Sequence, residues 1–200
     1  MKPPYVAMAA AFALTACGPL VQIGGNAKPP GSLLTLTATA TPGAPTGPVA
    51  SSGTLAVEVP AVPAALQTLR LPVTTSATEV TYLVGAIWAE QPARQFQRLL
   101  ADTLTAGGQA VVDTRQSNIS PARTLTGTLR DFGLDARDPA AMVVRVRYDA
   151  QIAAPRATEV ALRRFEASEA VASSDPVTVA AALNRAANRV AADVAGWTRR

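Results

Sequence analysis

The sequence predicts an α/β fold in which two main helices pack on one mixed, largely antiparallel sheet. Residues 144–150 alternate strictly between apolar and polar side chains, which is typical of a strand with one buried face. Two other stretches, which open at residues 91–92 and 175–176, carry apolar residues at helical spacing. The 200 residues suffice for one domain of ordinary size with additional chain.

Residues 1–16 predict a signal peptide for export, and a cysteine follows it. The apolar region, residues 5–13, is far shorter than the about 20 residues that span a bilayer. The tetrad that ends this segment resembles the lipobox of bacterial lipoproteins, in which the thiol takes a diacylglycerol and the freed amine is acylated: Leu14, Thr15, Ala16 and Cys17. We therefore expect Cys17 to be the first mature residue and to carry lipid. An ordinary secretory signal is the alternative.

Residues 17–53 predict a tether between the anchor and the folded part of the chain. The stretch is rich in Gly and Pro, and Lys28 is its only charge, so it cannot bury enough apolar surface to offset its ordering entropy. Residues 32–37 interrupt it with β-compatible side chains and could add a first strand. We expect the folded domain itself to comprise residues 54–200.

The first half of this domain predicts three short strands and a helix. The strands cover residues 54–59, 69–73 and 79–86 and are bounded by prolines or polar turns. Proline at the first helical position opens the helix at residues 91–92, and two glycines at 107–108 end it. Its apolar stripe, which we expect to face the sheet, consists of Phe96, Leu99, Leu100 and Leu104.

The second half predicts a short strand at 110–113, a meander of longer strands at 124–134, 144–150 and 160–170, and a terminal helix. Asp175 is a good N-cap for this helix, and proline follows it. The stripe that should face the sheet consists of Leu183, Ala187, Val190, Val194 and Trp197. We expect Trp197 and Trp88 to be core residues at the ends of elements.

The composition excludes most catalytic and metal-binding chemistry. The chain has no His and one Cys, so it cannot form a Ser-His-Asp triad, an imidazole metal site, a Cys cluster or an internal disulfide. Three aspartates could suggest an oxygen-ligand loop, namely Asp131, Asp135 and Asp138. Arg130 and Arg137 among them favour a solvated, salt-bridged hairpin tip instead. We expect no enzyme activity, no metal and no cofactor besides the covalent lipid.

The net charge of +4 at pH 7 would suit nucleic acid in a cytoplasmic protein, but export removes that partner. Loss of Lys2 with the signal leaves the mature chain at about +3. Arginines nevertheless gather on the predicted meander: Arg145, Arg147, Arg156, Arg163 and Arg164. They form either a solvated strand face or a contact for anionic head groups or an acidic partner. In the second case, Arg145, Arg147 and Arg163 are the candidate contacts.

Several short motifs occur in an order that resembles a known family. After the lipobox and tether come YLVGAIWAE at 82–90, LRDF at 129–132, RRFE at 163–166, VAAALN at 179–184 and a last Trp. From about residue 32 to residue 200, this order resembles the ABC-type transport auxiliary lipoproteins, the paraquat-inducible protein C-like family. The chain departs from that pattern in its sparse aromatics and in the long Ala/Thr-rich stretch before residue 54.

The resemblance implies a lipoprotein on the periplasmic face of the outer membrane that serves an MCE-type lipid transport system. In such systems an inner-membrane ABC transporter and an MCE-domain protein move phospholipid across the periplasm, and the lipoprotein would dock the periplasmic component, as a homo-oligomer or alone. Gly18 agrees, because Asp at that position usually retains enterobacterial lipoproteins in the inner membrane. Two other classes stay open, a stand-alone lipid- or ligand-binding lipoprotein and an envelope assembly scaffold. A closely packed, alanine-rich core disfavours the pocket that ligand binding needs.

Overall fold

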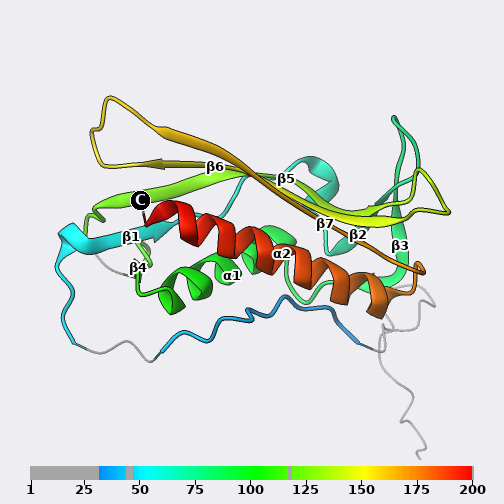
Figure 1. Cartoon of the computed structure of the whole chain (residues 1–200), viewed down its shortest axis with the longest axis horizontal. Helices are drawn as coiled ribbons and strands as arrows, with labels where there is room; N and C mark the ends of the chain where they lie inside the picture. Colours follow the sequence, from blue (N-terminus) through cyan, green and yellow to red (C-terminus); the bar gives the residue numbers. More distant parts are fainter. Residues whose placement is uncertain (1–31, 44–46, 117–118, 200) are drawn as a thin grey trace, which may run out of the picture.

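The computed structural model describes residues 32–43, 47–116 and 119–199 of the chain. These residues form one seven-stranded mixed sheet with two α-helices on one of its faces (Figure 1), which confirms the predicted fold class. The predicted signal peptide and the lipobox with Cys17 lie outside the described residues. None of the helices in the described ranges is long and apolar enough to cross a bilayer.

The elements follow the predicted order. The strands are β1 (Thr54–Val57), β2 (Arg70–Thr74), β3 (Val80–Ile87), β4 (Ala110–Val112), β5 (Arg123–Asp135), β6 (Val143–Ala153) and β7 (Ala161–Ala170). The helices are α1 (Pro92–Ala106) and α2 (Pro176–Thr198), with short 3-10 turns η1 (Ser51–Gly53) and η2 (Ala64–Leu66). Each predicted strand of the domain and both predicted helices overlap one of these elements, and the bounds differ by a few residues.

β5 is the centre of the sheet because three other strands pair with it. β6 runs antiparallel along almost the whole of β5, and β7 pairs antiparallel with β6. On the other side, β1 lies parallel to the N-terminal residues of β5, and β2 lies parallel to its C-terminal residues. β4 extends the sheet beyond β1, and β3 extends it beyond β2. A bulge between Leu129 and Asp131 leaves Arg130 outside the alternation of β5.

One face of the sheet packs on α1 and α2 and forms the core. The inward side chains of β6 are the apolar set that the alternation predicted, and all of them are buried: Val144, Val146, Tyr148 and Ala150. The predicted stripe of α1 is buried as well, with each of its four side chains at most 2% exposed. The chain therefore leaves the other face of β5, β6 and β7 without a covering helix (Figure 1).

α2 starts where the sequence predicted and packs closely against the sheet. The Asp175 carboxylate accepts a hydrogen bond from the Thr178 N–H at 2.9 Å, so it caps the first turn. Alanines occupy many of its buried positions, which lets the helix approach the strands. Trp88 is fully buried, and Trp197 is half-buried with its ring centroid 5.6 Å from that of Phe165. Trp88 is therefore a core residue, as predicted, whereas Trp197 is partly buried and packs against the core from the end of α2.

Residues 32–43, which we call the strap, lie along the two helices (Figure 1). The strap starts with a single β-bridge between Leu34 and Trp88. The Leu34 N–H donates to the Ile87 carbonyl at 2.8 Å, and the Leu34 carbonyl accepts from the Ala89 N–H at 2.9 Å. Leu34 also packs against the core. The strand predicted near residues 32–37 is thus reduced to one bridge.

Three side-chain amides of the helices hold the rest of the strap. Each accepts a hydrogen bond from a strap N–H: Leu36 to Gln95 Oε1 at 2.7 Å, Thr37 to Asn184 Oδ1 at 2.9 Å, and Thr39 to Asn188 Oδ1 at 2.8 Å. These side-chain oxygens accept the hydrogen bonds that the carbonyl groups of a neighbouring strand would otherwise accept. The strap is therefore part of the folded domain, and the tether predicted to reach residue 53 does not include it.

Candidate functional site

The uncovered face of the sheet carries a dense set of ionised side chains, which we call the charged face. Side chains alternate between the two faces of a strand, so the residues of β6 that flank its buried positions point outward. The register of β5 and β7 then brings their outward residues beside them. The charged face comprises Asp131, Asp135, Arg145, Arg147, Asp149, Arg164 and Glu166.

Arg145 and Arg147, two of the predicted contact residues, lie together on the charged face and are paired within the chain. Arg145 contacts Asp135 Oδ2 at 3.1 Å and Glu166 Oε1 at 3.5 Å. Arg147 donates from Nε to Glu166 Oε2 at 3.0 Å and lies 3.2 Å from Asp131 Oδ2. Glu166 therefore joins the two arginines, and neither guanidinium is without a carboxylate partner.

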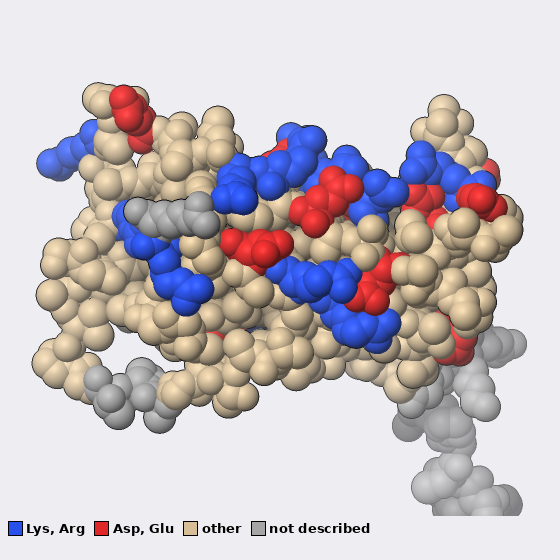
Figure 2. All heavy atoms as spheres, viewed as in Figure 1, with Lys and Arg blue, Asp and Glu red and all other residues tan. Residues whose placement is uncertain are grey.

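Three carboxylates of this face have pKa values below their ordinary range because arginines donate hydrogen bonds to them. The hydrogen bond from the Arg137 side chain lowers the pKa of Asp135 to about 2. The hydrogen bond from Arg164 lowers the pKa of Asp149 to about 2 in the same way, and Arg147 lowers the pKa of Glu166. These three carboxylates are thus ionised at neutral pH, and acidic and basic side chains alternate over the charged face. Figure 2 shows the same mixing of basic and acidic side chains over the visible surface.

Of the three aspartates that could have suggested a metal loop, Asp135 and Asp138 lie at the β5–β6 turn, whereas Asp131 lies within β5. Asp135 pairs with Arg137 at 2.5 Å, and Asp131 pairs with Arg147. Asp138 instead caps the turn, because its carboxylate accepts a hydrogen bond from the Ala140 N–H at 2.9 Å. Across the described ranges, no group of three or more acidic, His or Cys residues could hold a metal ion.

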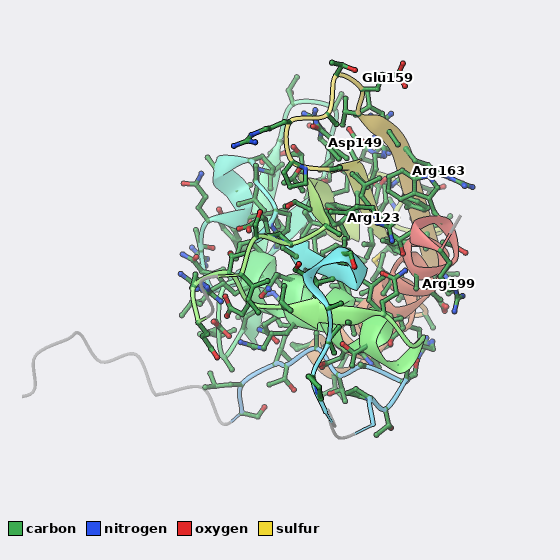
Figure 3. All side chains as sticks on the ribbon, turned by 90° about the vertical axis from the view of Figure 1, so that its left-hand side faces the viewer. Arg123, Asp149, Glu159, Arg163 and Arg199 are labelled. Carbon is green, nitrogen blue, oxygen red and sulfur yellow. The ribbon has the colours of Figure 1, made fainter. Side chains whose placement is uncertain are left out.

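Arg163 lies on the opposite face from Arg145 and Arg147. The β6–β7 register pairs Arg163 with Ala150, whose side chain belongs to the buried face. The guanidinium carbon of Arg163 is 5.2 Å from the ring centroid of Phe165. In Figure 3, Arg163 reaches outward at the edge of the sheet, apart from Asp149. The structure therefore does not place the three predicted contact residues on one surface.

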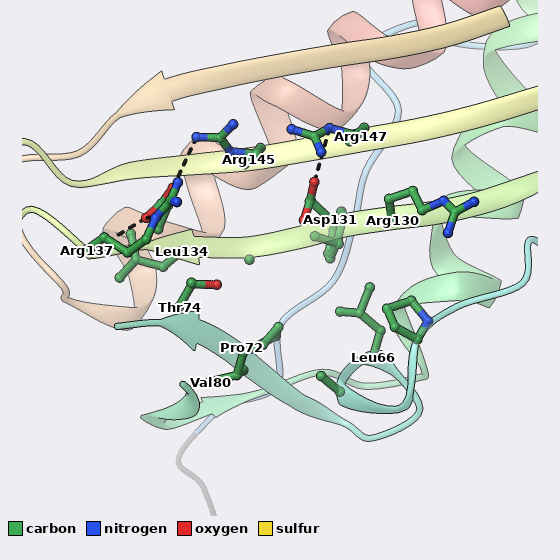
Figure 4. A pocket seen from close by; sticks show the side chains of 15 residues that line it. Leu66, Pro72, Thr74, Val80, Arg130, Asp131, Leu134, Arg137, Arg145 and Arg147 are labelled. Atoms are coloured by element: carbon green, nitrogen blue, oxygen red, sulfur yellow. Dashed lines mark hydrogen bonds and ion pairs between the residues drawn. The ribbon is translucent and has the colours of Figure 1, made fainter. Parts of the chain in front are cut away.

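A groove of about 400 Å³ lies beside the charged face (Figure 4). One wall consists of charged side chains from β5, β6 and the turn between these two strands, among them Arg130, Arg137, Arg145 and Arg147. The other wall is mainly apolar and comes from η2, β2 and β3: Leu66, Pro72, Thr74 and Val80. An adjoining shallow hollow of about 590 Å³ shares Arg130, Asp131 and Arg147 with the groove.

The sequence reasoning missed the apolar wall of the groove. Leu66 belongs to a 3-10 turn, and Pro72 and Val80 belong to a hairpin that reaches β5 only through the parallel pairing of β2. No local pattern marks these residues, because their position depends on a contact between elements about 60 residues apart. A charged wall opposite an apolar wall can hold a partner's side chains, because it offers both ion pairs and buried area.

The fold and the chain match known proteins. A family model described as "ABC-type transport auxiliary lipoprotein component" matches residues 34–195. The search of curated proteins gave no match. The solved structure of protein XCC0632 from Xanthomonas campestris, of family DUF330, is similar with a TM-score of 0.70 and 22% identity, over 84% of this chain and 94% of that one. The crystal structure of an uncharacterized protein is similar with a TM-score of 0.64 and 15% identity, over 84% of this chain and 99% of that one. At these identities, the two structures show the common fold alone.

Proposed function

Given that this chain belongs to the family of ABC-type transport auxiliary lipoprotein components, we propose that it docks a periplasmic component of an ABC-type transport system at the outer membrane. The system would be a lipid transporter of the MCE type, and the docked component would be its MCE-domain protein. The lipobox and Gly18 support the outer-membrane anchor, which would be the covalent lipid on Cys17. The domain would work by binding and not by chemistry.

The observation that carries the proposal is the groove beside the charged face. It lies on the face of the sheet that neither helix covers, so a partner can reach it without any rearrangement of the fold. Val80 is 49% exposed on its apolar wall, and Arg145 and Arg147 stand on its charged wall. Interfaces gain most of their affinity from a few side chains that become fully desolvated, and arginine is one of the commonest of these. We therefore assign the partner contact to this groove.

The pairing of the arginines determines which variant tests the groove. Replacing Arg145 and Arg147 by glutamate would set new negative charges beside Asp131, Asp135 and Glu166, so the domain itself would be destabilised. Val80→Arg avoids this problem because Val80 is half-exposed and lies on the apolar wall. Val160→Arg is a matched control, because Val160 is 48% exposed and does not line the groove.

The test is co-purification of the MCE-domain protein from detergent-solubilised envelopes. We expect Val80→Arg to lose the partner and Val160→Arg to retain it, with the circular dichroism of both variants unchanged. Retention by both variants would remove the groove from the docking surface. Loss in both variants would place the contact on a wider surface than the groove.

The anchor has a separate test. Only a thiol can form the thioether to diacylglycerol, and Cys17 is the one cysteine of the chain. We expect Cys17→Ser to abolish labelling of the protein by radioactive fatty acid and to release it from the membrane fraction. Equal labelling of the variant would refute the anchor.

A further inference from the structure

Three exposed apolar side chains gather at the end of the molecule where the strap begins. Val84 is 88% exposed, Val177 is 70% exposed and Leu33 is 54% exposed. They are three of the four most exposed large apolar side chains in the described ranges. The fourth, Leu162, is near the β6–β7 hairpin at the other end of the sheet. We call Leu33, Val84 and Val177 the apolar end.

Local backbone geometry brings these three residues to one place. The register of β2 and β3 shifts between Arg70 and Pro72, so the β3 residues around Val84 bulge out of the sheet. Gly85 in this bulge has φ +78°, and a Cβ built on it would lie 3.8 Å from Pro176 Cγ. The bulge therefore contacts the first turn of α2, where Val177 follows. Leu33 precedes the bridge of the strap to the end of β3.

The strap determines at which end the N-terminal chain enters the domain. Thr37 bonds to Asn184 and Thr39 bonds to Asn188, so the strap runs along α2 in the same direction as the helix. Its first residues therefore lie at the N-terminal end of α2, beside β3 (Figure 1). Without the strap, the chain would enter the domain at β1, towards the other end of the molecule.

The length of chain between Cys17 and the strap limits how far the strap can lie from the lipid anchor. Cys17 and Ser32 are 15 residues apart, so even a fully extended chain spans at most about 50 Å between them. The 23 residues of α2 alone are about 35 Å long. The anchor therefore keeps the apolar end within about 50 Å of the bilayer, whereas the hairpin end can lie further away by about the length of α2.

We propose that the apolar end rests on the lipid surface, with Leu33, Val84 and Val177 inserted among the head groups. This inference rests on the proposed lipid anchor at Cys17. Three small side chains bind a bilayer weakly by themselves, but a covalent lipid already supplies the affinity. Their role is orientation: they fix which end faces the membrane and direct the β6–β7 hairpin away from it.

The test uses the full, lipidated chain in vesicles of phosphatidylethanolamine and phosphatidylglycerol. Because the lipid occupies the Cys17 thiol, an introduced cysteine is the only reactive one. Val84→Cys, Val177→Cys and the control Leu162→Cys, which is 66% exposed at the far end, are labelled with a polarity-sensitive fluorophore. The vesicles contain a lipid with a nitroxide quencher near the head group. We expect loss of most fluorescence at positions 84 and 177 and none at position 162.

The outcomes separate the inference from the anchor on which it rests. Thiol labelling of the unsubstituted chain, or failure of the protein to float with vesicles, would refute the anchor. Flotation without quenching at positions 84 and 177 would refute the lipid contact alone. A blue-shifted but unquenched fluorophore there would show that a second copy or another protein covers the apolar end, and would also overturn the inference.

Discussion

Replacing Asn188 by alanine should release the strap without unfolding the domain. The Asn188 carboxamide accepts hydrogen bonds from the Thr39 N–H at 2.8 Å and the Thr39 hydroxyl at 3.0 Å, and it donates to the Thr37 carbonyl at 2.9 Å. Each such bond contributes a net of about 0.5–1.5 kcal/mol. Both threonines are exposed, so water replaces part of the loss. We therefore expect the free energy of strap opening to fall by about 2 kcal/mol, which raises the equilibrium constant of opening about 30-fold.

Amide hydrogen exchange measures this opening. In Asn188→Ala, peptides that cover residues 34–40 should exchange about 30-fold faster, while those from β6 keep their rate. Asn184→Ala is the matched control, because Asn184 accepts a single strap hydrogen bond, from the Thr37 N–H, and should give a smaller increase. Unchanged strap exchange in Asn188→Ala would refute the assigned role of this amide. Equal acceleration in the strap and β6 would show that the strap does not open separately from the domain.

Three further variants test the core, the sheet and the charged face. Val190→Asp puts an unpaired carboxylate at a fully buried position of α2 and should lower the free energy of unfolding by about 3–5 kcal/mol, measured by thermal melting, whereas Ala192→Asp on the exposed side of the helix should cost little. Gly127→Ala should destabilise the domain by at least about 1–3 kcal/mol in urea unfolding, because its Cβ would lie 2.3 Å from the Asp149 carbonyl oxygen; an unchanged midpoint would contradict this packing. Asp135 has a folded-state pKa of about 2, below its ordinary 3.8, so the stability it supplies is present above about pH 4 and is lost as the pH falls towards 2. The advantage of the unsubstituted chain over Asp135→Asn, at most about 2 kcal/mol at pH 6, should therefore shrink at pH 2.5, and a constant difference would argue against the ion pair.

The sequence predicted those parts of the fold whose signals are local. The alternation around Tyr148 identified both faces of β6, and the spacing of apolar residues identified the buried sides of α1 and α2. Proline positions placed the starts of both helices, and the glycine pair at 107–108 placed the end of α1. In each case the residues that carry the signal also form the element, so no distant contact is needed to interpret them.

The strap, the groove and the position of Arg163 depend on distant partners instead. The strap has the composition of a tether, and the amides that order it are 59 to 151 residues away in sequence. Arg163 and Arg164 are neighbours in sequence, and only the register with β6 decides which of them reaches the charged face. The sequence could therefore identify arginines of the meander as candidates but could not assign them to one surface.

The separation in sequence between paired elements sets an order of assembly. β5, β6, β7 and α2 follow one another along the chain, so their contacts close short loops. The contact of Thr54 with Ala122 spans 68 residues, and that of Thr39 with Asn188 spans 149. Because closure of longer loops costs more entropy, we expect the C-terminal meander and α2 to fold first, β1 to join them next and the strap to dock last. Pulse-labelling hydrogen exchange during refolding tests this order of assembly. Early protection of the strap amides would contradict it. A chain that is cut before Asn188 would keep the contacts of Leu34 and Leu36 but would lose the amide that binds the Thr37 carbonyl and Thr39, however complete its sheet.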